Sequence, residues 1–345
     1  VTPIFEQLKH LLTSSNQFER RAAYLAIGAT ATGAPDFYSA HLEKIVEVIV
    51  TGLKDSELIV RVSALRSLAQ LTTELQDLLA EYHEQLLPLI ISIIDGATNA
   101  VVYKYACTSL DSLIEFMSHD AIQKFLEPLM NKLFHLLQVT DTSSLRSIIV
   151  SAIGSAAYAA GTSFKPYFNQ SVEILQHFIQ NSASVEGLSE DDIELRALTF
   201  ENISTMARAV GSESFSQYAK PLVDAAYTSI NSESSRLRES GFAFITNMAK
   251  VYKKDFAAFL PNIMPEIFKC LEQEEFNVNF GEEDEFNDDD EDLANKFQVH
   301  TGITIEKEIA AIALSELALG TKELFADYVE QSVTILSTQA QDSYG

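Results

Sequence analysis

The densest run of ionisable groups in the chain lies between Gly281 and Asp292, where the sequence reads GEEDEFNDDDED and nine of twelve residues are carboxylates. Acid or base catalysis needs a carboxyl whose pKa is shifted by burial, and no apolar sequence encloses this run. Dense, solvated carboxylates instead attract a basic partner. We expect an acidic loop near residues 274–296, with the candidate contact residues Glu282, Glu283, Asp284, Glu285, Asp288, Asp289, Asp290, Glu291 and Asp292.

The other reactive residue types show no catalytic arrangement. The seven histidines are scattered, with no HExxH motif and no His or Cys pair at the spacing of metal ligands. No glycine-rich phosphate loop, GxSxG motif or kinase signature is present. Cys107 and Cys270 stand alone in apolar stretches and are expected to be buried thiols of a reducing compartment. The sequence therefore predicts no enzyme, no metal site and no cofactor.

The chain repeats one helical pattern seven times. Each copy starts with a basic or aromatic residue, followed three residues later by a mostly small residue and seven residues later by Ile or Leu, so one helix face is apolar. The starts are Arg20, Arg61, Tyr103, Arg146, Arg196, Arg238 and Lys307, and the apolar residues are Ile27, Leu68, Leu110, Ile153, Ile203, Ile245 and Leu314. These segments are predicted to be seven equivalent helices.

A second helical series alternates with the first. An aromatic residue leads each member, and an apolar residue follows eight positions later on the same face. The aromatic residues are Tyr38, Tyr82, Phe125, Tyr167, Tyr218, Phe259 and Tyr328. Each unit is thus a helical hairpin, and the usual interval of about 42 residues is the length of a HEAT unit.

This periodicity predicts an all-α fold, a right-handed superhelix or solenoid of about seven to eight HEAT units that forms one domain over residues 1–345. The longest interval, before Lys307, contains the acidic run, which is therefore an insertion in a repeat. Solenoids need polar capping repeats, and neither end of the chain has one. We expect a piece of a longer protein.

Composition excludes several classes of partner. The net charge is −25, and a nucleic-acid binder needs clustered Lys and Arg. The longest uncharged span, Ser147 to Phe164, is too rich in Ser, Ala and Gly to sit in lipid. Without tryptophan, the Trp and Asn ladder of armadillo-type adaptors cannot be built. We expect a monomer that binds basic proteins, not nucleic acid or a membrane.

In a two-layer solenoid the second helix of each unit lines the concave side, so its polar positions face a partner. These positions lie five, six, nine and twelve residues after each start, and they hold short neutral or acidic side chains in adjacent units. Carboxylate, amide and hydroxyl oxygens together can accept the three bonds of a lysine ammonium. The alternative is that these residues only solvate a helix face. The candidates at these positions are Glu115, Ser151, Ser155, Glu201, Asn202, Thr205 and Asn247, and Asp111, eight residues after its start, lies at the edge of the stripe.

The segment from Thr301 to Val333, TGITIEKEIAAIALSELALGTKELFADYVEQSV, directly follows the acidic run. This segment resembles the central region of the importin-beta superfamily, the karyopherins. With the HEAT-length units, the resemblance is closest to the branch that imports ribosomal proteins and histones and includes importin four.

The resemblance implies a receptor that shuttles between cytoplasm and nucleus, carries histones and ribosomal proteins, and releases them when Ran-GTP binds. It places a lysine pocket at Ser151, Ser155, Glu201, Asn202 and Thr205, flanked by Asp111, Glu115 and Asn247, and implies contacts with Phe-Gly nucleoporins. The amino-terminal repeats that contact Ran in the family are not recognisable in this sequence.

Two other functions fit the same sequence. A passive HEAT scaffold would hold partner subunits and leave the acidic loop dispensable. An acidic histone chaperone would bind histones mainly through the loop, and the polar positions of the helices would matter little.

Overall fold

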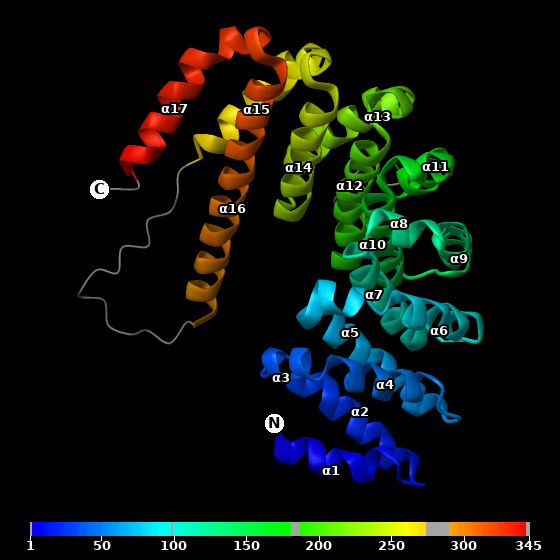
Figure 1. Cartoon of the computed structure of the whole chain (residues 1–345). Coiled ribbons are helices and arrows are strands. Elements are labelled where there is room, and N and C mark those ends of the chain that lie inside the picture. The colour runs from blue at the N-terminus through cyan, green and yellow to red at the C-terminus, as the bar shows by residue number, and fades with distance from the viewer. Residues whose placement is uncertain (1, 98, 181–186, 274–289, 343–345) are drawn as a thin grey trace. The chain divides into compact units, whose positions relative to one another are not determined.

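The protein is described by a computed structural model that covers residues 2–97, 99–180, 187–273 and 290–342 (Figure 1). Within these ranges every regular element is a helix, which confirms the predicted all-α fold. The chain divides into two compact units, residues 1–172 and 173–345. The boundary falls within one helix, α11.

The first unit is built from paired helices. In each pair the second helix, called the inner helix below, packs on the one before it and on the inner helices of the neighbouring pairs. The inner helices α2, α5, α7 and α10 lie side by side in one row (Figure 1). The elements are α1 (Thr2–Leu12), α2 (Gln17–Ala31), α3 (Pro35–Ala40), α4 (Leu42–Leu53), α5 (Leu58–Ala80), α6 (His83–Asp95), α7 (Ala100–Glu115), α8 (His119–Gln123), α9 (Leu126–Val139), α10 (Ser143–Ala160), the 3-10 helix η1 (Gly161–Phe164) and α11 (Lys165–Gln180).

The second unit is also built from paired helices. Its inner helices are α12, α14 and α16, and α14 packs against both of the others. The elements are α12 (Glu190–Val210), α13 (Ser212–Ile230), α14 (Ser235–Tyr252), the 3-10 helix η2 (Lys253–Phe259), α15 (Leu260–Leu271), α16 (Asp290–Thr321), the 3-10 helix η3 (Lys322–Tyr328) and α17 (Val329–Asp342).

The repeated apolar positions form the core of both units. All seven Ile and Leu residues predicted from the inner series are buried, and none is more than 3% exposed. The apolar residues of the second series are buried too, except Leu336 on α17, which is 42% exposed. Cys107 and Cys270 are buried free thiols, as predicted.

In five of the seven inner helices, the residue that starts the sequence pattern also joins the two helices of its own pair. Its side chain donates a hydrogen bond to the backbone carbonyl six residues earlier, at the end of the preceding helix, where carbonyls lack helical partners. The sequence pattern located these residues but did not reveal this role. The bonds join Arg20 to Ser14, Arg61 to Asp55, Tyr103 to Ala97, Arg146 to Thr140 and Arg238 to Ser232, at 2.7 to 3.0 Å between donor and acceptor.

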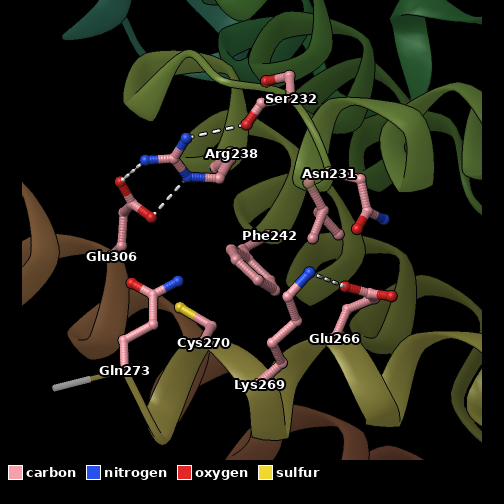
Figure 2. A pocket seen from close by; sticks show the side chains of 10 residues that line it. Asn231, Ser232, Arg238, Phe242, Glu266, Lys269, Cys270, Gln273 and Glu306 are labelled. Atoms are coloured by element: carbon pink, nitrogen blue, oxygen red, sulfur yellow. Dashed lines mark hydrogen bonds and ion pairs between the residues drawn. The ribbon is translucent and has the colours of Figure 1, made fainter.

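Two of these arginines also bind a carboxylate of the following repeat. Arg20 donates to both oxygens of Asp55 at 2.8 and 3.0 Å, and Arg238 to both oxygens of Glu306 at 2.7 and 2.6 Å. Figure 2 shows the Arg238 guanidinium held between Glu306 and the Ser232 carbonyl. Each such ion pair connects one repeat to the next.

The acidic insertion lies between α15 and α16, and most of it falls outside the described residues. The predicted loop, residues 274–296, extends too far toward the carboxyl terminus, because α16 already begins at Asp290 and residues 290–296 are helical. Acidic residue types suit the first turn of a helix, where the helix dipole is positive. The helical pattern therefore extends further toward the amino terminus than the charge run indicated.

Five of the seven inner helices are followed by a left-handed residue at one equivalent position. The residue fifteen positions after the start of the pattern has φ between 42° and 88°, a region in which only glycine avoids strain. These residues are Gln76, Gly161, Gly211, Lys253 and Lys322. At Gln76 the turn appears as a kink within α5.

In the part of the chain that the structure describes, one helical stretch, Ser143–Ile179, is long and apolar enough to cross a membrane by length and composition alone. In the structure, 61% of its apolar window is buried within the protein, as in the core helix of a soluble fold.

Candidate functional site

Four of the residues predicted to bind cargo lie on α7 and α10, neighbouring inner helices of the first unit. Asp111 and Glu115 are one turn apart on α7, and Ser151 and Ser155 are one turn apart on α10. The Ser155 hydroxyl donates a hydrogen bond of 2.6 Å to Oδ1 of Asp111. Glu115 is exposed, and the other three are partly buried. We call these four residues the first polar cluster.

The pKa of the Asp111 carboxyl is higher than usual. Burial raises its pKa to about 6; the hydrogen bond from Ser155 opposes this shift, and the charge of Glu115 adds to it. An approaching cation would favour the ionised form of this carboxyl and lower its pKa. The first polar cluster thus offers two carboxylates and two hydroxyls, which are acceptors for an ammonium group.

The other four predicted residues belong to the second unit, with Glu201, Asn202 and Thr205 on α12 and Asn247 on α14. These two inner helices pack against each other. We call these four residues the second polar cluster. It contains one acidic side chain, Glu201.

The Glu201 carboxylate already has a cationic partner. Arg236 donates to Oε1 of Glu201 at 2.6 Å and to the two oxygens of Glu194 at 2.8 and 3.0 Å. Burial alone would lower the pKa of Arg236, but the hydrogen bonds to Glu194 and Glu201 outweigh it and raise that pKa. Oε1 of Glu201 and both oxygens of Glu194 are thus already bonded to a cationic group.

Two members of the second polar cluster bond to their own helix. The Asn202 amide donates to the Leu198 carbonyl at 2.8 Å, and the Thr205 hydroxyl donates to the Glu201 carbonyl at 3.1 Å. Their acceptor oxygens stay available, because each donation uses hydrogen and not an oxygen lone pair.

Asn247 connects α14 to α12. Its amide nitrogen donates to the Ser204 hydroxyl at 3.0 Å, and its Oδ1 accepts a bond of 3.4 Å from Arg208. This asparagine is therefore part of the contact between two repeats and is only partly open to a ligand.

The structure adds residues that sequence reasoning overlooked. Tyr158 on α10 is 65% exposed and stands twelve residues after Arg146, a position that the spacing rule itself selects. Arg236 stands two residues before its start, outside the rule. The position six residues after the start is less open than predicted in the third unit. Ser109, which stands there, is fully buried, and its hydroxyl donates to the Tyr105 carbonyl at 2.9 Å.

The predicted acidic-loop residues Glu282, Glu283, Asp284, Glu285, Asp288 and Asp289 lie outside the described residues. Asp290, Glu291 and Asp292 are in the first turn of α16, and only their backbone is described. Among the described residues no group of three His, Cys, Asp or Glu side chains is arranged to hold a metal ion.

Comparison with known proteins decides the family. Residues 67–196 match the TPR repeats of importin subunit beta-1-like proteins. The probable importin subunit beta-4 of Schizosaccharomyces pombe is 34% identical over 96% of this chain. The chain belongs to the importin-beta superfamily. Importins are transport receptors, not enzymes, which agrees with the absence of a predicted catalytic site.

Solved structures share the fold of this importin segment. Kap121p bound to Pho4p superposes with a TM-score of 0.79 at 23% identity, and Kap121p bound to Nup53p with a TM-score of 0.78 at 23% identity; each covers 96% of this chain. The chain spans about a third of its relatives, 32% of the fission yeast importin and 32% of each Kap121p chain.

Proposed function

We propose that the chain is a segment of a nuclear import receptor that binds lysine-rich signals of basic cargo on its inner helices. The proposal is supported by family membership and by the net charge of −25, which attracts basic proteins. Histone tails and ribosomal proteins are the cargo classes we expect. A receptor of this kind is found in both cytoplasm and nucleus.

The observation that carries the proposal is the hydrogen-bonded pair of Asp111 and Ser155 beside Glu115. A lysine ammonium has three donors and needs an acceptor for each when it leaves water. The second carboxylate oxygen of Asp111, the Ser155 lone pairs and the exposed Glu115 carboxylate provide them. Such charge-assisted bonds are stronger than neutral ones, which favours lysine over an uncharged side chain.

Tyr158 supports the same reading of the first polar cluster. It lies on α10, as Ser155 does, with most of its surface open to solvent. An aromatic face attracts an ammonium group and also packs against the methylene stem of lysine.

The second polar cluster is proposed as a weaker lysine site. Arg236 neutralises much of the negative charge of Glu194 and Glu201, so a ligand there must share or displace an existing ion pair. Asn202, Thr205 and Asn247 would then contribute neutral acceptors.

Ran-GTP and Phe-Gly nucleoporins are proposed as partners of the longer protein. A groove of about 430 Å³ in the second unit supports a nucleoporin contact, since Met264, Pro265, Phe268 and Tyr328 give it apolar walls suited to an aromatic side chain. The similarity to Kap121p bound to Nup53p points the same way.

Isothermal titration calorimetry with a synthetic lysine-rich peptide and its lysine-to-glutamine counterpart tests the proposed function. We expect saturable binding of the lysine peptide at about 150 mM salt, where diffuse attraction is screened, and none of the glutamine peptide. Equal binding of both peptides would favour the passive scaffold. Binding that disappears when residues 282–292 are deleted would favour the acidic chaperone.

A further inference from the structure

A cationic pocket stands out on the second unit of this acidic chain. It has a volume of about 810 Å³ and lies where the end of α14 and the start of η2 meet the end of α16. Two acidic residues, Asp255 and Glu316, line this pocket. It is also lined by four lysines, Lys250, Lys253, Lys254 and Lys322. The whole chain has 24 Lys and Arg residues against 49 Asp and Glu. In this pocket, by contrast, basic lining residues outnumber acidic ones.

Two of these lysines have a carboxylate partner. Lys250 pairs with Glu316 at 3.3 Å, and Lys254 pairs with Glu323. Within the described residues, the ammonium groups of Lys253 and Lys322 make no hydrogen bond or ion pair, and both residues are exposed. The pocket therefore presents two exposed ammonium groups that form no ion pair with the described residues.

The same two lysines occupy strained backbone positions. Lys253 has φ 51° and Lys322 has φ 53°, at the position where Gly161 and Gly211 end other inner helices. A side chain at such a φ strains the backbone, and glycine avoids this strain. Two repeats in succession thus keep a lysine where glycine would be more stable.

The backbone brings these lysines close together. A β-carbon on Gly320 would lie 2.9 Å from the Ala249 carbonyl oxygen and 3.6 Å from Cα of Lys253. Only glycine permits this approach of α16 to the end of α14, and Lys322 follows two residues later. Beside them Leu319, which is 67% exposed, gives the pocket one open apolar side chain.

We propose that this pocket binds an acidic segment of a partner protein, with carboxylates on Lys253 and Lys322 and an apolar side chain against Leu319. Its ligand has the opposite charge to the lysine-rich signals proposed for the two polar clusters. The chain would then hold a basic and an acidic partner at separate places. This inference does not depend on the proposed cargo site.

The test is fluorescence anisotropy with a labelled pentapeptide, Glu-Asp-Leu-Glu-Asp, at low salt, and with its neutral counterpart Gln-Asn-Leu-Gln-Asn. We expect the acidic peptide to bind despite the net negative charge of the protein, and to bind roughly tenfold more weakly to the Lys253→Gly/Lys322→Gly variant. Because glycine suits a positive φ, this variant is expected to be at least as thermally stable as the original chain, so lost binding cannot be attributed to misfolding.

Two control variants complete the design. Lys253→Arg/Lys322→Arg keeps the charge and should keep binding, while Gln76→Gly makes the same backbone change in the first unit and should leave binding unaltered. The proposal is overturned by unchanged binding in the double glycine variant, by equal binding of the neutral peptide, or by no binding of the acidic peptide to the original chain.

Discussion

The guanidinium of Arg238 and the carboxylate of Glu306 form a two-point ion pair between residues 68 positions apart, one on each side of the acidic insertion. Glu306 is only 1% exposed, and Arg238 also donates to the carbonyls of Ser232 and Glu233. One side chain thus closes its own helical pair and fixes α16 after a long interruption of the repeat. A cavity of about 200 Å³ beside it, lined by Phe242, Cys270 and Gln273, completes this junction (Figure 2).

Replacing Arg238 by alanine should destabilise the second unit strongly. The change leaves the buried carboxylate of Glu306 without its partner, and breaking a buried pair in this way costs about 3–5 kcal/mol. Thermal unfolding followed by circular dichroism measures the effect. Lys220→Ala, which removes an exposed pair with Asp224, is the control and should change stability by less than about 1 kcal/mol. Equal shifts for the two variants would refute the role given to Arg238.

Gln76→Gly should stabilise the first unit. Gln76 is exposed and has φ 42°, so glycine relieves strain and removes no packed side chain. Relief of strain, less the entropy that glycine loses on folding, should amount to about 1 kcal/mol. Gly161→Ala is the matched variant: its β-carbon would come no closer than 3.8 Å to another group, so its expected loss of stability reports the positive φ alone. Stability changes of the opposite sign would exclude the proposed strain.

These features mark what the sequence can and cannot predict. The buried Ile and Leu of each inner helix were predicted, because burial follows the period of a helix and leaves a regular signal. Arg20, Arg61 and Arg238 were located by the same period, yet their carbonyl bonds were not predicted, because a donor's partner depends on how a turn folds back. Arg236 was missed for a related reason, since its bonds to Glu194 and Glu201 cross between repeats.

The raised pKa of Asp111 predicts the direction in which stability changes with pH. The ordinary value is 3.8 and the folded value is about 6, so between these values the unfolded chain loses the proton while the folded chain keeps it. Stability should fall as the pH rises through this window, by on the order of 3 kcal/mol in total. Asp111→Asn abolishes the ionisation and should unfold at a higher temperature than the original chain at neutral pH. Urea unfolding of both proteins at several pH values checks this, and parallel pH profiles would contradict it.

Binding of a lysine peptide should show the opposite trend with pH. The peptide needs the ionised carboxylate of Asp111, so its affinity should rise as the pH rises through about 6. In Asp111→Asn this rise should disappear, because that side chain cannot ionise. Anisotropy titrations across the range distinguish the two proteins. A rise that persists in Asp111→Asn would show that the dependence does not come from Asp111.

Arg236 should limit lysine binding at the second polar cluster. Arg236→Gln removes one positive charge and frees the carboxylates of Glu194 and Glu201, so a lysine-rich peptide should bind about threefold to tenfold more tightly. Lys220→Ala, which also removes one positive charge from the second unit, controls for the change in net charge. Calorimetry on both variants makes the comparison. An equal gain in each would mean that net charge, and not the local ion pair, sets the affinity.

We propose that the inner helices, and not the acidic insertion, hold the basic ligand. Fluorescence anisotropy of a labelled lysine-rich peptide at about 150 mM salt distinguishes the two places, with the original chain, an Asp111→Ala/Glu115→Ala variant and a deletion of residues 282–292. We expect at least about tenfold weaker binding to the double variant and nearly unchanged binding to the deletion. Binding that survives in the double variant and is lost in the deletion would contradict it.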